Sequence, residues 1–87
     1  MYSFLMAQNH TDLPTITISG ADGVIFQDIP KGCSSVKRRV APGSVRLEIY
    51  NNFMKLLTVV WVPLAPYESA VIVIYPDHVQ LIVQPLP

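Results

Sequence analysis

Residues 42–52 decide the fold class; they read PGSVRLEIYNN in one-letter code. Val45, Leu47 and Ile49 alternate with charged residues, which is the two-residue period of a strand with one buried face. A Pro-Gly turn precedes this strand, and Asn51-Asn52 follows it. Because asparagine tolerates positive φ, we expect a hairpin here that leads into the next apolar run, residues 53–62.

Similar short runs, rich in Val, Ile, Thr and aromatic residues, fill the rest of the chain. Prolines separate most of these runs, and proline is confined to turns, edges and strand starts. The predicted strands cover residues 2–7, 15–19, 24–27, 36–40, 45–50, 53–62, 68–75 and 79–84. No window has a convincing helical period. We therefore predict a single all-β domain over residues 1–87, a seven- to eight-stranded antiparallel sandwich.

Alternation also predicts which side chains face the core. In the last strand Val79, Leu81 and Val83 are expected to point inward, with Gln80 and Gln84 outward. Trp61 is expected to be buried, because sandwich domains usually place a tryptophan in the core.

Three motifs carry a family resemblance: the strand at 15–18, the run at 24–32, and the Pro-Gly-x-Val-x-Leu-x-Ile strand at 42–49. Over residues 3–85 the chain resembles a family of small bacterial β-sandwich domains of unknown function. The resemblance implies an immunoglobulin- or transthyretin-like sandwich, and it transfers no active site.

The composition limits the classes of function. Apolar residues make up 51% of the 87 residues, charged residues only 14%, and the net charge is zero. This argues against a disordered chain and against non-specific nucleic-acid binding. The longest mostly apolar run, 56–65, is too short for a membrane span. The N-terminus lacks the basic and apolar regions of a signal peptide, so we expect an intracellular protein by default, with spore or envelope association as the location that the resembled family implies.

The apolar excess suggests a function. The runs 56–62 and 68–75 are apolar on both faces, which predicts a second apolar contact surface and a homo-oligomer. We therefore expect a non-enzymatic structural or interaction module that associates with itself. The alternative is a carbohydrate- or cell-wall-binding module that uses Tyr50, Tyr67 and Tyr75 as exposed stacking rings, with a polysaccharide or another surface protein as partner.

Lys37-Arg38-Arg39 is the one run of charges in the sequence. On a strand, Lys37 and Arg39 share a face, which makes them candidates for contact with an anionic partner. The simpler interpretation is that these charges protect an edge strand from unwanted pairing.

A third hypothesis is a thiol- or metal-dependent enzyme. Cys33 lies in a loop near a lysine, while His10 and His78 lie in predicted turns near Asp12 and Asp77. A nucleophile needs a positioned base, and two histidines alone make a weak metal site. No phosphate loop or nucleophile elbow is present. We therefore expect no catalytic residue, no metal and no cofactor.

Overall fold

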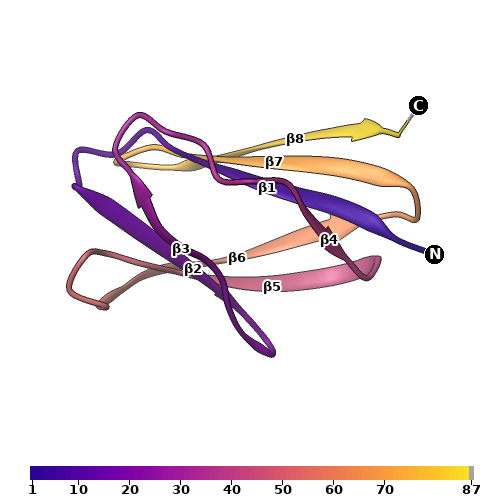
Figure 1. The fold of residues 1–87 in the computed structure, drawn as a ribbon, viewed down its shortest axis with the longest axis horizontal. Coiled ribbons are helices and arrows are strands. Elements are labelled where there is room, and N and C mark those ends of the chain that lie inside the picture. The colour runs from indigo at the N-terminus through magenta and orange to yellow at the C-terminus, as the bar shows by residue number, and fades with distance from the viewer. Residues whose placement is uncertain (87) are drawn as a thin grey trace.

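The computed structural model describes residues 1–86, which form eight β-strands (Figure 1). The strands are β1 Ser3–Asn9, β2 Thr15–Gly20, β3 Gly23–Pro30, β4 Arg38–Val40, β5 Gly43–Tyr50, β6 Leu56–Leu64, β7 Glu68–Ile74 and β8 Val79–Pro85. The all-β prediction is confirmed, and each expected strand exists with shifted ends. No helix within residues 1–86 has the length and hydropathy to cross a membrane.

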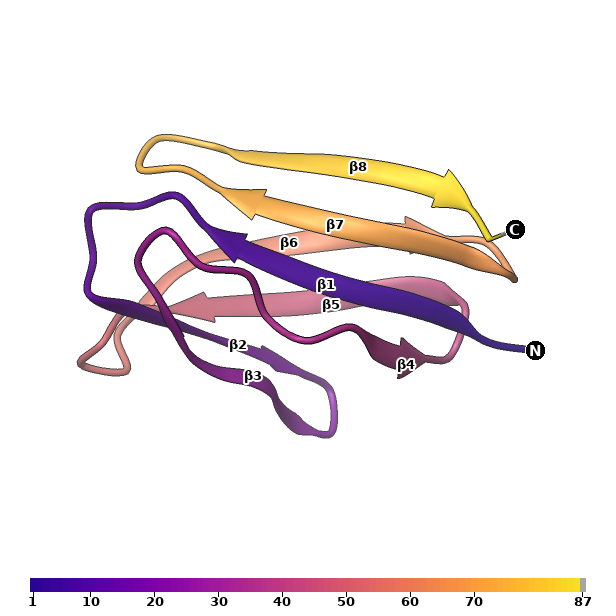
Figure 2. The same cartoon turned by 45° about the horizontal axis from the view of Figure 1, so that its top comes forward.

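The strands form two facing sheets of four, in the orders β4-β1-β7-β8 and β3-β2-β5-β6 (Figure 2). This confirms the predicted sandwich. One pairing departs from the expected antiparallel pattern, because β1 and β7 run parallel, with Leu5 opposite Ala70 and Ala7 opposite Ile72. The N-terminal strand thereby fills the centre of its sheet between β4 and β7.

The core lies between the two sheets and is built from alternate residues of the central strands. Leu47 and Ile49 of β5 are fully buried, as their alternation with Arg46 and Glu48 predicts. The facing sheet contributes aliphatic side chains from β1 and β7, among them Leu5, Ala7, Ala70, Ile72 and Ile74. Packing of these two layers supplies the main favourable free energy of folding.

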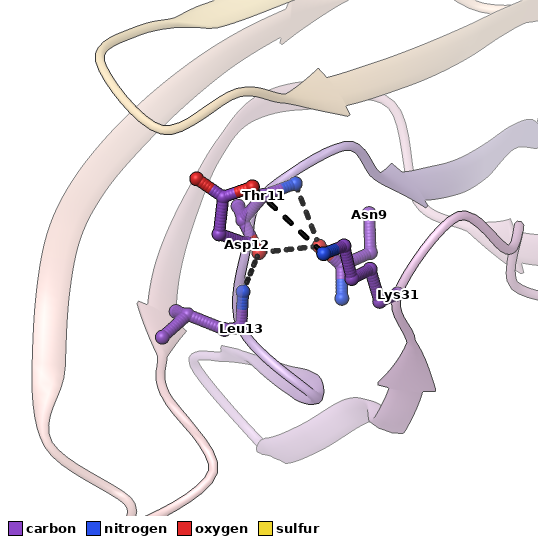
Figure 3. A network of polar contacts seen from close by, with 5 residues as sticks. All are labelled: Asn9, Thr11, Asp12, Leu13 and Lys31. Carbon is purple, nitrogen blue, oxygen red and sulfur yellow. Dashed lines mark hydrogen bonds and ion pairs between the residues drawn. The ribbon is translucent and has the colours of Figure 1, made fainter.

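A buried polar network centred on Asn9 ties the first sheet to the second, and Figure 3 shows its contacts with Thr11. Asn9 has no exposed surface, and its Nδ2 donates to the carbonyl of Ile29, 2.9 Å away. Its Oδ1 accepts from the backbone N–H of Thr11 at 3.0 Å and from the Thr11 hydroxyl at 2.6 Å. The connection from β1 to β2 is therefore fixed by paired polar groups rather than left open to solvent.

The predicted burial of Trp61 is wrong, since its side chain is 60% exposed. In β6 both sets of alternate residues are apolar, so sequence alternation could not select the inward face. The pairing with β5 selects it: Val62 lies opposite Val45 and Trp61 lies opposite Arg46, which faces solvent. A register shift between Ile49 and Tyr50 sets this phase.

Other expectations also need correction. Val36 is 79% exposed and precedes β4, which is shorter than predicted. Val83 was expected in the core but is 37% exposed, because β8 is an edge strand with a neighbour on one side only. The run 68–75 is not a second contact surface. It forms the central strand β7, in which Ala70, Ile72, Val73 and Ile74 are buried.

The sandwich has two distinct ends. The β1–β2, β5–β6 and β7–β8 connections gather at one end, and both termini lie at the other (Figures 1 and 2). The β4–β5 turn also lies at the end with the termini. Strands β5 and β6 run the length of the molecule, so each presents side chains at both ends.

Candidate functional site

The three tyrosines that we expected to form a binding platform lie in separate places. Tyr50 ends β5 in the second sheet, whereas Tyr67 and Tyr75 flank opposite ends of β7 in the first. A strand of that length separates its ends by roughly 20 Å. Only Tyr67 is largely exposed, at 51%, and Tyr50 and Tyr75 are half-buried. The three rings therefore do not make one stacking surface.

Two of the predicted contact residues, Arg39 and Lys37, contact neighbouring aromatic rings on the outer face of the first sheet. The Arg39 guanidinium lies 4.5 Å from the centroid of the Tyr2 ring, and the Lys37 ammonium lies 5.0 Å from that of Phe4. Tyr2 makes edge-on contacts with both Phe4 and Tyr67, at 5.5 Å between centroids. These cations cover the ring faces of Tyr2 and Phe4, so those faces are already used within the chain.

The two histidines come together around one tyrosine. The His78 ring stacks on Tyr75 at 4.5 Å and 12°, and the His10 ring tilts against Tyr75 at 5.3 Å. His78 Nδ1 lies 2.7 Å from Asp77 Oδ1, and this hydrogen bond lowers the pKa of the Asp77 carboxyl. Within residues 1–86 no three His, Cys, Asp or Glu side chains are grouped to hold a metal ion.

Cys33 lies exposed in the loop between β3 and β4. Its backbone is well held, because its carbonyl accepts from Asn9 N–H at 2.9 Å and its N–H donates to Pro30 at 3.0 Å. His10 Nε2 donates to Gln8 Oε1 at 3.3 Å. The nucleophilic role of Cys33 stays a hypothesis.

Tyr50 belongs to a small polar group on the outer face of the second sheet. Burial raises the pKa of its phenol, and the hydrogen bond to Glu48 Oε1, at 3.2 Å, raises it further. Glu48 Oε2 also pairs with Arg46 Nη1 at 3.2 Å. The Tyr50 ring is thus part of a side-chain network of its own sheet.

Apolar side chains are exposed together at the β5–β6 turn. We name this surface the hairpin patch; its members are Phe53, Met54, Leu56 and Leu57, exposed by 85%, 55%, 46% and 45%. Leu56 and Leu57 belong to the run 56–62, which we expected to present an apolar contact surface. The exposure of Phe53 and Met54 was not expected, because Phe53 was placed inside the strand. The apolar residues directly after Asn51-Asn52 were the signal for this surface in the sequence.

The turn that carries the hairpin patch is held by Asn51. Its Oδ1 accepts from the N–H groups of Phe53 and Lys55, both at 2.9 Å, and its carbonyl accepts from Met54 N–H at 3.0 Å. Met54 has a φ of 59°, a conformation that costs free energy for a non-glycine residue. Phe53 is therefore held outward by a defined turn rather than carried on an unstructured loop.

A cleft of about 660 Å³ adjoins the hairpin patch. Leu57 belongs to both the patch and the cleft wall. The floor includes the core residues Ile49 and Ile74, and the rim carries Asp77 and His78. Apolar surface thus continues from the patch into the space between the sheets.

Comparison with known proteins supports the fold. No protein-family model and no curated protein matches the chain. Among solved structures, the chain is similar to the C-terminal domain of AlgF from P. aeruginosa, with a TM-score of 0.54 and 15% sequence identity. The match covers 95% of this chain and 96% of that domain, and at this identity it shows a shared small β-fold alone. Membership of the resembled β-sandwich family and its immunoglobulin-like topology stay predictions.

Proposed function

We propose that this chain is a non-enzymatic interaction module that associates with a second copy of itself through the hairpin patch. The observation that carries the proposal is Phe53, 85% exposed and held outward by the hydrogen bonds of Asn51. A phenylalanine fixed in water is unfavourable unless another surface covers it. Because the turn is already ordered, covering it costs little further conformational entropy.

The charge of the chain supports a second copy as the occupant. The net charge is zero, so two copies approach without net repulsion. Lys55 is the one charged residue from 51 to 60, which leaves the patch almost free of charge. Strand β6 next to the patch is also an edge strand, and its outer backbone groups are open to pairing.

The patch lies beside an apolar cleft. Phe53 and Met54 project from the turn, and the cleft of about 660 Å³ has an apolar floor beside them. Covering a side chain such as phenylalanine contributes about 1.5–3 kcal/mol. Central aromatic residues of this kind commonly dominate the affinity of an interface.

Sedimentation velocity at micromolar concentration tests the proposal. We expect the wild-type chain to associate reversibly and Phe53→Ser to weaken association at least about tenfold. Val24→Ser is the matched control, since Val24 is 47% exposed on β3, the opposite edge of the same sheet. A wild-type chain that remains monomeric, or equal weakening by Val24→Ser, would contradict the proposal.

A further inference from the structure

All three arginines of the sequence and its single tryptophan line one cleft of about 730 Å³. Arg38 and Arg39 come from β4 in the first sheet, Arg46 from β5 and Trp61 from β6 in the second. The β2–β3 turn at 20–23 and the β4–β5 turn at 41–44 complete the wall. The fold therefore gathers these side chains from three consecutive strands that belong to two different sheets.

The cleft concentrates positive charge in a neutral chain. Asp22 is the one acidic residue of its lining, against three arginines. Arg38 Nη1 donates to the Ile25 carbonyl at 3.0 Å, which holds the side chain against the cleft wall. A guanidinium has five N–H donors, so this bond leaves most of them for a ligand.

Arg46 and Arg39 each make a contact within the chain, and the two contacts differ. Arg46 pairs with Glu48 through one Nη1 contact at 3.2 Å and retains further donors. The Arg39 guanidinium lies over Tyr2 on the outer face of the first sheet, so Arg39 adds charge at the margin of the cleft. Arg38 and Arg46 are the residues placed to bind an anion directly.

Trp61 gives the cleft a flat apolar surface next to this charge. Its side chain is 60% exposed, and it lies directly across from Arg46 in the β5–β6 pairing. Indole faces cover the apolar faces of sugar rings, and arginine binds carboxylates through paired N–H groups. Tryptophan beside arginine thus suits a ligand that has both a ring and an anionic group.

We propose that this cleft binds an acidic saccharide, with the carboxylates held by Arg38 and Arg46 and a sugar ring packed on Trp61. The site lies apart from the hairpin patch, none of whose residues line it. A nucleic acid is the less favoured ligand, because the chain has no net positive charge to follow a phosphate backbone.

Titration of oligogalacturonate into the full chain, followed by Trp61 fluorescence and calorimetry, tests the site. We expect saturable binding that weakens as salt increases, and no binding of uncharged malto-oligosaccharide at the same concentration. Arg46→Ala and Arg38→Ala should each lower affinity about tenfold, the effect of losing one charge-assisted hydrogen bond.

Lys55→Gln is the matched control, because it removes one positive charge from the β5–β6 turn and should leave the affinity unchanged. Trp61→Leu should weaken binding when it is followed by calorimetry, and circular dichroism checks that each variant folds. No oligogalacturonate binding, equal binding of the uncharged sugar, stronger binding of oligothymidylate, or equal loss in Lys55→Gln would overturn the proposal.

Discussion

The two ends of the second sheet present opposite chemistry on the same pair of strands. At the β5–β6 turn, Phe53 and Leu57 are exposed, and Lys55 is the one charged residue from 51 to 60. Toward the other end, Arg46 and Trp61 lie across from each other and line a cleft that Arg38 also reaches. The β5–β6 hairpin therefore carries two surfaces that are separable by mutation.

The physical difference lies in how each end holds its side chains. The hairpin patch depends on backbone geometry, because Asn51 fixes the turn through the N–H groups of Phe53 and Lys55. The arginine cleft depends on tertiary placement, because β4 brings Arg38 from the first sheet to the second. We expect local changes to affect the first and changes in packing between sheets to affect the second.

The largest expected effect removes the support common to both ends. Leu47 is fully buried in β5 between the sheets. Leu47→Ala should lower the free energy of unfolding by about 2–5 kcal/mol, through lost apolar burial and the cavity that remains. Chemical denaturation measures it, with Leu57→Ala as an exposed control that should cost below ~1 kcal/mol. Equal losses in the two variants would contradict this assignment of the core.

A smaller effect should separate the two ends. Asn51→Ala removes the acceptor of two turn hydrogen bonds and should cost about 1 kcal/mol of stability. We expect weaker self-association, measured by sedimentation, with unchanged oligogalacturonate affinity. Asn52→Ala, at the neighbouring exposed position, should leave both unchanged. A matching loss in Asn52→Ala would mean that Asn51 does not organise the patch.

Substitution of Arg39 tests whether this residue lies at the margin of the cleft or contacts the ligand directly. Its guanidinium lies over Tyr2, a contact worth about 0.5–1 kcal/mol at an exposed site. Arg39→Gln should therefore lower stability by about that amount and reduce saccharide affinity less than Arg46→Ala does. Denaturation and calorimetry on the two variants measure both effects. A larger affinity loss for Arg39→Gln would place Arg39 among the direct ligand contacts.

The smallest effect concerns pH. The pKa of Asp77 is lowered from 3.8 in the folded chain, because His78 donates a hydrogen bond to it. This contact stabilises the fold above the unfolded pKa and is lost as the pH falls through the folded pKa, in the region below 3.8. NMR titration should show the Asp77 pKa rising in His78→Ala, and an unchanged pKa would refute the role of this bond.

The parts that sequence could predict are those where apolar and polar residues alternate. Val45 to Tyr50 allows one phase only, because the opposite phase would bury charged side chains. β6 allows both phases, and the register shift at Tyr50 that chooses between them depends on the turn. The candidate sites could be predicted less well than the fold. Arg38 and Trp61 line the same cleft only because of the sheet order, which no local pattern encodes.

Sedimentation velocity on three chains tests the separation of the two ends most directly. The wild-type protein and Arg46→Ala should associate with the same concentration dependence, whereas Phe53→Ser should associate at least about tenfold more weakly. Association as strong in Phe53→Ser as in the wild type, or weakened equally in Arg46→Ala, would contradict the assignment of self-association to the hairpin patch.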